Sequence, residues 1–253
     1  MNAPESVNCA VCSSPLKPEQ KFCVKCGRPV ISSRATVMLN DTRSQKIIFS
    51  VFGAILLFVV LSGFCNTGSI ESSTVFDVVS IVLSLSFVMI VWKDMREVIA
   101  EFRIKWWWIP VVISSALLMA VVVHFFVNEL EARSGITSSV RYLYTDTAYP
   151  YFFAVLSIAL VPAVFEELLF RGVLISQLVK LINRSGAIWV SAFTFAILHL
   201  SIVSLLWLLP AGLITGWMRF YTRQLWPGML FHFIYNFTVI TLHSWLDVHY
   251  FSM

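Results

Sequence analysis

The sequence predicts an all-α polytopic membrane protein with about seven to eight transmembrane helices, preceded by a small cysteine-rich domain. Of its 253 residues, 58% are hydrophobic and only 13% are charged, and the mean hydropathy is +0.81, far above that of an ordinary soluble domain. Several apolar stretches are long enough to cross a hydrocarbon core of about 30 Å. The net charge of +4 does not indicate a nucleic-acid partner, because the basic residues lie between the apolar stretches. The lipid bilayer is the expected surrounding.

The first domain, residues 1–30, contains two Cys-x-x-Cys pairs separated by ten residues. Four thiolates at this spacing can surround a tetrahedral zinc ion, and a segment this small needs such a staple to fold. Two disulfides or redox-active dithiols are the alternatives. The segment also resembles the short zinc ribbons of bacterial membrane proteins, so we expect a structural zinc and a role in docking a protein partner. The predicted zinc ligands are Cys9, Cys12, Cys23 and Cys26.

A polar linker is expected over residues 31–46, and the transmembrane domain over residues 47–253. The first span is predicted from Ile47 to Cys65, whose thiol we expect to be packed. An acidic loop that contains Glu71 and Asp77 should then lead into a second span over residues 78–92.

A basic loop follows the second span and is expected to include an interfacial amphipathic helix over part of residues 93–105. Three tryptophans, 106–108, open a third span that runs to Val127, as an aromatic belt at the membrane interface would. His124, near the far end of this span, is predicted to be an interface histidine. Residues 128–149 are expected to form a polar loop.

Pro150 opens a fourth span, and Pro162 is predicted to kink it, which frees a backbone carbonyl and opens space beside the helix. Residues 173–183 are too short to cross the membrane and should form a partial or interfacial helix. Three further apolar segments complete the domain, over residues 187–200, 202–218 and 228–246.

The basic residues favour seven spans over eight. With the amino terminus in the cytoplasm and seven spans, sixteen of the eighteen Lys and Arg residues lie on the cytoplasmic side, as the positive-inside rule expects. Only Arg133 and Arg141 lie outside. If residues 173–183 cross the membrane, Arg219 and Arg223 move outside and the bias weakens. The side of the carboxyl terminus depends on this choice.

The segment Phe165–Gly172, which reads FEELLFRG, places two carboxylates and an arginine in apolar sequence. Ionisable side chains within a span usually face a protein interior or a wet cavity and have a function there. Glu167 and Arg171 are four residues apart and share a helix face, whereas Glu166 points about 100° away. One glutamate can therefore pair with the arginine and leave the other free. The alternative is that all three mark the cytoplasmic end of a span.

Two later segments place histidines in apolar sequence. Phe195 and His199 lie one helical turn apart, and so do His232 and Asn236. A lone histidine on an apolar face is most often a satisfied core residue. Three helices that each carry polar groups into lipid are harder to explain in that way, because unpaired polar groups cost several kcal/mol there, so we expect the groups to face one another.

Together these residues resemble the motif set of the CPBP intramembrane proteases, also called the Abi or CAAX-protease family, which are relatives of CAAX prenyl protease 2. The resemblance covers about residues 148–246, and any one motif alone would be unspecific. The three motifs, in order and on successive helices, are Glu166-Glu167-x-x-x-Arg171, Phe195-x-x-x-His199 and His232-x-x-x-Asn236.

The resemblance implies hydrolysis of peptide bonds within the membrane. Glu166 would be the general base and would act with His199 on a water molecule, while His232 and Asn236 would stabilise the oxyanion. Glu167 with Arg171 would hold the geometry, although the two glutamates can exchange roles. A catalytic divalent metal held by Glu166, His199 and His232 is an equal alternative, because two nitrogens and a carboxylate with an open position form an acceptable zinc site.

The expected substrate is a peptide or membrane protein, since a ribbon of this kind suggests a bacterial cytoplasmic membrane, where prenylated CAAX proteins are not expected. Two functions of other classes remain alternatives. One is a non-catalytic bacteriocin-immunity or scaffold protein that binds a partner in the same polar cavity. The other is a small transporter with a Glu and His proton relay, against which the lack of an internal repeat counts.

Overall fold

The computed structural model describes residues 7–8, 13–16, 41–65, 69–100, 105–134 and 147–250. Nearly all of these residues are helical, which confirms the predicted α-helical class. Two short strands, β1 (Val7–Asn8) and β2 (Pro15–Leu16), pair antiparallel. The four cysteines predicted to bind zinc lie outside the described residues.

Helix α2 (Thr42–Cys65) begins five residues earlier than predicted, so the end of the expected linker is helical. The reason is a capping interaction at its first turn, where the backbone N–H of Ser44 donates to the Asp41 carboxylate at 3.1 Å. The expectation of a packed Cys65 thiol was wrong. Cys65 is the last residue of the helix, and its side chain is exposed.

Helix α3 (Ile70–Ile90) corrects the predicted acidic loop. Ser69 caps this helix by accepting a hydrogen bond from the Ser72 N–H at 3.2 Å, and Glu71 lies in the first turn. Asp77 therefore lies two turns inside a helix and not in a loop. The predicted loop is wrong because the Ser69 cap starts the helix at Ile70, and the Asp77 carboxylate does not interrupt it.

Helix α4 (Trp92–Ala100) lies where a helix was expected in the basic loop, and helix α5 (Trp108–Ser134) follows it. The predicted polar loop after residue 127 is wrong in its first seven residues, which continue α5. An ion pair between Glu129 and Arg133, four residues apart, supports this extension. His124 is only 2% exposed and packs against His243 with ring centroids 5.0 Å apart, so it is a buried residue and not an interface histidine.

Residues 150–181 form one continuous helical rod of 32 residues. Its parts are α6 (Pro150–Ala154), the π-helical turn η2 (Val155–Leu160), α7 (Val161–Glu167), the π-helical turn η3 (Leu168–Leu174) and α8 (Ile175–Leu181). The prediction of a separate partial helix at 173–183 was wrong. The helix continues without a break to Leu181, and the extended backbone of Ile182 ends the rod.

The last three helices are α9 (Arg184–Ile197), α10 (Leu205–Thr222) and α11 (Trp226–Tyr250). Helices α9 and α10 pack as a close hairpin, in which a Cβ added to Gly212 would lie 2.9 Å from the Cβ of Ala192. With 14 residues, α9 is about 21 Å long, less than the membrane core. The turn after its carboxyl end is largely exposed, with Leu200 59% and Ile202 86% exposed.

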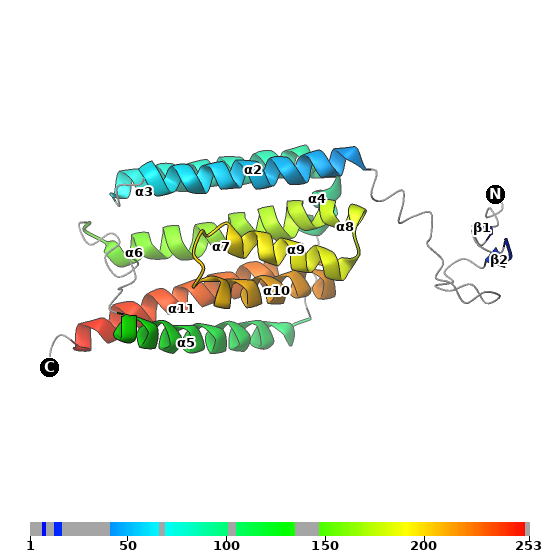
Figure 1. The fold of residues 1–253 in the computed structure, drawn as a ribbon. Helices are drawn as coiled ribbons and strands as arrows, with labels where there is room; N and C mark the ends of the chain where they lie inside the picture. Colours follow the sequence, from blue (N-terminus) through cyan, green and yellow to red (C-terminus); the bar gives the residue numbers. More distant parts are fainter. Residues whose placement is uncertain are drawn as a thin grey trace.

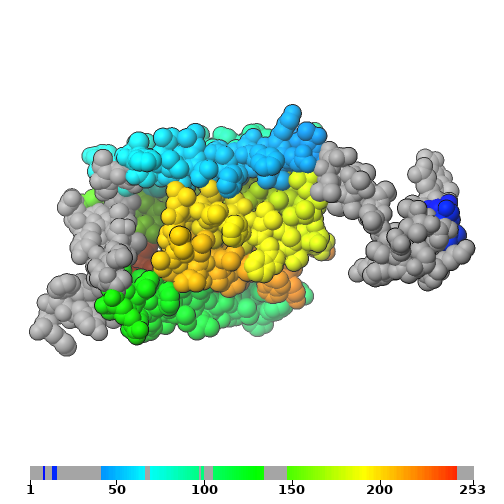
Figure 2. Space-filling view, viewed as in Figure 1, coloured from blue at the N-terminus to red at the C-terminus, as the bar shows by residue number. Residues whose placement is uncertain are grey.

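The helices form layers. The α2–α3 pair covers one side of the rod and of the α9–α10 hairpin, and α5 with α11 covers the other side (Figure 1). Figure 2 shows the same order on the surface, with the yellow and orange segment between blue α2 and green α5. The rod and α9, which carry two of the polar motifs, therefore lie between two outer layers, and α11 carries the third motif in one of those layers.

Four of the described helical segments are long and apolar enough to cross a membrane. They are Thr42–Cys65, Ile70–Ile90, Trp108–Arg133 and Pro150–Leu181. This supports an integral membrane protein, whereas a count of seven or eight spans stays a prediction. The start of α2, helix α4, the end of α8 and the start of α9 lie at the same end of the bundle (Figure 1).

A polar network ties three of these elements together at that end. The Ser44 hydroxyl of α2 donates to the side-chain oxygen of Gln177, in α8, at 3.0 Å. The Gln177 amide donates to the Asp94 carboxylate of α4 at 3.0 Å, and Lys180 donates to the same oxygen at 2.7 Å. Ser44 and Gln177 are each 1% exposed, so these bonds satisfy polar groups that are shielded from water.

We expect the Asp94→Asn variant to lose part of the pH dependence of stability. Burial raises the pKa of the Asp94 carboxyl, but hydrogen bonds from Lys180 and Gln177 outweigh it and hold the pKa below 3.8. Such a lowered pKa stabilises the fold above the ordinary value, and this contribution is lost as the pH falls through the folded value. In thermal unfolding, the midpoint of the wild type should fall further than that of the variant on acidification below about pH 4. Equal falls would contradict this assignment.

Candidate active site

The two glutamates of the FEELLFRG segment have different surroundings, as expected. Arg171 Nη1 lies 3.0 Å from Glu167 Oε1, and the two side chains are 2% and 1% exposed. The Glu166 side chain is 34% exposed and faces a cavity. One carboxylate is thus held by a buried cation, and the other is accessible. The π-helical turn η3 carries Arg171, and such turns occur often at functional sites.

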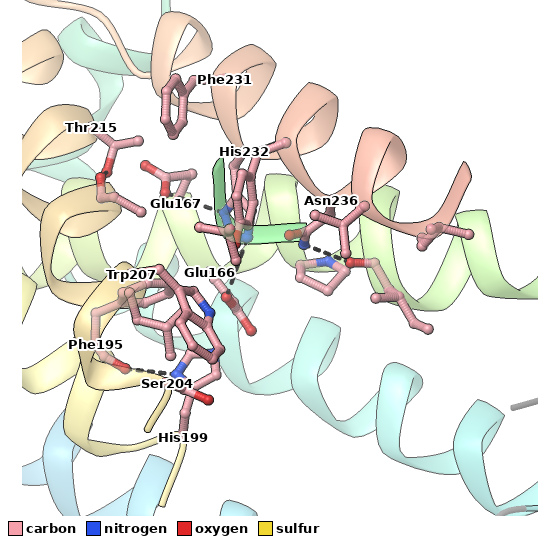
Figure 3. Close-up of a pocket in the computed structure, with 18 of the residues that line it drawn as sticks. Glu166, Glu167, Phe195, His199, Ser204, Trp207, Thr215, Phe231, His232 and Asn236 are labelled. Carbon is pink, nitrogen blue, oxygen red and sulfur yellow. Dashed lines mark hydrogen bonds and ion pairs between the residues drawn. The ribbon is translucent and has the colours of Figure 1, made fainter. Parts of the chain in front are cut away.

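His232, from α11, lies between the two glutamates (Figure 3). Its Nδ1 is 3.4 Å from Glu167 Oε1, and its Nε2 is 3.9 Å from Glu166 Oε2. Gly228, one turn earlier in α11, allows this close approach, because a Cβ there would lie 2.9 Å from Glu167 Oε2. When it is protonated, the imidazole can therefore form an ion pair with both carboxylates, and it couples the buried ion pair to the accessible carboxylate.

His199 follows the last turn of α9 and is held by the backbone of that turn. Its Nδ1 lies 2.8 Å from the carbonyl oxygen of Phe195, which can only accept, so Nδ1 carries the proton. In neutral His199 the Nε2 atom is then left as an acceptor. The next residue, Leu200, has φ of 51° and turns the chain away from the helix, a conformation that is uncommon outside glycine.

Phe195 packs at the centre of these groups. The Arg171 guanidinium lies over its ring at 4.4 Å from the centroid. The His199 and His232 rings meet it edge-on, with centroids 4.9 Å and 6.0 Å away. At 2% exposure, Phe195 keeps water from the ion pair and fixes the positions of both imidazoles.

Asn236 makes a hydrogen bond that its motif position did not indicate. Its Nδ2 donates to the carbonyl oxygen of Ile158 at 2.7 Å. Pro162, four residues after Ile158, has no N–H for that carbonyl, as the predicted kink implied. Asn236 therefore joins α11 to the rod at the proline, and a role at the oxyanion must use its second N–H.

Replacing Asn236 with leucine is expected to destabilise the protein by about 1–3 kcal/mol, because the partly buried Ile158 carbonyl loses its side-chain donor. Unfolding by heat or denaturant in detergent measures this cost. Unchanged stability would show that the rod satisfies the carbonyl without Asn236.

Two cavities adjoin these residues. The first, about 420 Å³, is lined by side chains of α5, the rod, α10 and α11, including Glu166, His232 and Asn236. The second, about 350 Å³, lies towards α2 and α3. Both are lined by Pro162, Glu166, Phe195 and His199. The structure thus brings all six predicted site residues, Glu166, Glu167, Arg171, His199, His232 and Asn236, to the first cavity.

Sequence reasoning missed other polar residues at the cavities. His124 and His243 line the first cavity, as does Ser157, and Asp77 lines the second. A carboxylate well inside an apolar segment was the available signal for Asp77. His243 belongs to no motif, and only packing places it beside His124.

The residues do not fit a preformed three-ligand metal site. In the described part of the chain, no three His, Cys, Asp or Glu side chains gather closely enough to hold an ion. Glu166 and His232 are 3.9 Å apart, a spacing that two ligands of one ion could adopt, but His199 lies outside this pair. No hydrogen bond or ion pair between Glu166 and His199 is found among the described residues, so a water molecule must lie between them if they act together.

Comparison with known proteins gives a match to one family model. Residues 148–238 match the family model described as type II CAAX prenyl endopeptidase Rce1-like. The searches of curated proteins and of solved structures gave no match. The match spans 91 of 253 residues, so it covers the rod, α9, α10 and the site half of α11 but not the segment before residue 148. The match and the ordered motifs agree that residues 148–238 are similar to the CPBP/CAAX membrane proteases.

Proposed function

We propose that this protein is an endopeptidase that hydrolyses peptide bonds of membrane-associated substrates at Glu166. The observation that carries the proposal is that two adjacent carboxylates, at a largely apolar cavity, differ in their partners and in their exposure. Glu167 is closed off by Arg171, whereas Glu166 is accessible and lies beside His232. A scaffold or immunity protein does not require one paired and one accessible carboxylate at its binding cavity.

In the proposed reaction, a water molecule binds between Glu166 and Nε2 of His199. Glu166 removes a proton as the water attacks the scissile carbonyl, and His199 orients the water by accepting its second hydrogen. Such general acid–base catalysis typically contributes a factor of about 10²–10⁴. The protonated Glu166 then gives its proton to the departing amine.

The negative charge that develops on the carbonyl oxygen needs donors. His232 provides one from Nε2, while its Nδ1 faces the Glu167–Arg171 pair. The second N–H of Asn236 is the other candidate, because the first is used by Ile158. Glu167 and Arg171 hold His232 in place and do not react.

The metal alternative uses Glu166, His199 and His232 as ligands of a divalent ion, which would activate the water in place of the carboxylate. Elemental analysis of the purified protein, with and without residues 1–30, separates the two mechanisms. We expect about one zinc per chain, bound by the ribbon cysteines and lost with the truncation. One zinc that survives truncation and disappears in Glu166→Ala or His199→Ala would overturn the metal-free mechanism.

For the ribbon we propose a structural zinc and a role in recruiting substrates on the cytoplasmic side of a bacterial membrane. The antiparallel pairing of β1 with β2 supports a compact unit on either side of Cys9 and Cys12. Deleting residues 1–30 should then slow processing of a native membrane substrate but not of a short peptide. Equal processing of the native substrate would show that the ribbon does not recruit it.

The proposed activity is tested with purified full-length protein in lipid nanodiscs, mixed with membrane proteins from cells that lack it. New amino termini are identified by mass spectrometry. We expect termini that appear with the wild type and not with Glu166→Gln. Identical sets of termini would overturn the proposal. A farnesylated peptide with a carboxy-terminal CAAX sequence and its unprenylated form then show whether the prenyl group is required.

A further inference from the structure

Glu166 and His199 stand between two cavities rather than at the end of one. The first cavity, about 420 Å³, and the second, about 350 Å³, share both of these residues. Each volume lies in the range of about 300–1,000 Å³ typical of ligand sites. Ser157 of the rod, which lines the first cavity, also hydrogen-bonds to Asp77, which lines the second. The two cavities therefore adjoin each other at these residues.

The two cavities differ in their ionisable groups. Four of the five histidines of the chain line the first cavity: His124, His199, His232 and His243. Apart from the shared Glu166 and His199, the ionisable residue among those lining the second cavity is the carboxylate Asp77. The remaining wall there is aliphatic and aromatic, with three serines. Asp77 lies in a candidate membrane span, where an unused carboxylate is costly.

This difference matches the two products of amide hydrolysis. Water adds to the carbonyl carbon, the C–N bond breaks, and one proton of the water passes through Glu166 to the leaving nitrogen. Ionisation of the new carboxylic acid supplies the second proton, which converts the amine to an ammonium group. The amino-terminal fragment ends in a new carboxylate, and the other fragment begins with a new ammonium group. Histidine N–H groups suit the first product, and the Asp77 carboxylate suits the second.

We propose that the substrate passes through the site, with the residues after the scissile bond in the second cavity and their new amino group directed to Asp77. This inference rests on the proposed function and gives the substrate a direction. Aromatic and aliphatic walls at Phe58, Phe76 and Leu83 select an apolar residue directly after the cleaved bond. The peptide before the bond lies in the first cavity.

Binding of small product analogues tests the role of Asp77 without requiring catalysis. The probes are leucyl-phenylalanine amide and its N-acetyl form, titrated into full-length protein in nanodiscs. We expect the free amine to bind about tenfold more tightly than the acetylated form, because it makes a charge-assisted contact. Asp77→Asn should remove this difference, and Glu71→Gln, an exposed carboxylate on the same helix, should keep it. Equal binding of both probes to the wild type, or a difference that survives in Asp77→Asn, would overturn the inference.

A second variant keeps the test decisive if Asp77→Asn does not fold. Ser62 is half-buried on α2 and lines the second cavity, so Ser62→Phe fills it without touching the motif residues. Val127→Phe does the same in the first cavity. Among mapped cleavage sites, Ser62→Phe should shift the residues after the bond towards smaller ones, and Val127→Phe those before it. The reverse pattern, or no shift in either variant, contradicts the direction, whereas absence of any wild-type cleavage contradicts the proposed function itself.

Discussion

Glu166→Gln is expected to reduce peptide hydrolysis by at least about a hundredfold while leaving the folded protein intact. Glutamine keeps the shape and polarity of the side chain but cannot accept a proton from water. Glu166 is partly exposed at the cavity, and glutamine can keep the contact with His232. The measurement is the rate of cleavage of one mapped substrate peptide, together with the thermal unfolding midpoint of both proteins.

The matched control for this prediction is Glu71→Gln, which removes a carboxylate from the first turn of α3, away from the cavities. Its cleavage rate should equal that of the wild type. If Glu166→Gln retains most of the activity, Glu166 is not the base. If it fails because the protein unfolds, the residue is structural and the catalytic assignment is wrong.

Arg171→Met should destabilise the protein by about 3–5 kcal/mol, because it leaves the Glu167 carboxylate buried without its cation. Glu167 is 1% exposed and lies 3.0 Å from the guanidinium. Adding Glu167→Gln to the Arg171→Met variant should recover much of this loss, because the uncompensated charge is then gone. Denaturant unfolding of the single and double variants measures both effects.

The chain contains a matched comparison for this ion pair. Arg133 and Glu129 are also four residues apart on a helix, but their side chains are 79% and 63% exposed. Arg133→Met should therefore change stability little, since exposed pairs contribute about 0–1 kcal/mol. Equal losses in Arg133→Met and Arg171→Met would mean that burial does not set the strength of the Arg171 pair.

Much of the fold follows from the sequence because apolar length and helical spacing act locally. The pairing of Glu167 with Arg171 needs only an i,i+4 relation, and it was predicted correctly. The segment ends were predicted less well. Asp77 is charged, yet it lies within a helix, because the cap at Ser69 starts that helix before it. Residues 128–134 are largely polar, yet they continue α5, and the Glu129–Arg133 pair supports this extension.

The features that could not be predicted from the sequence are contacts between helices that are distant along the chain. Asn236 lies 78 residues from the Ile158 carbonyl that it satisfies, and only the packing of α11 on the rod brings them together. The same holds for Asp77 with Ser157 and for His124 with His243. The shared walls of the two cavities arise from two separate segments, the rod and the end of α9, and no spacing within one segment encodes them.

The most direct test of the account is the incorporation of water oxygen at new carboxyl termini. Purified protein in nanodiscs is incubated in H₂¹⁸O with membrane proteins from cells that lack it, and carboxyl termini are read by mass spectrometry. The account predicts ¹⁸O-labelled termini with the wild type and none with Glu166→Gln. No labelled termini with the wild type, or the same labelled termini with both proteins, would contradict peptide hydrolysis at Glu166.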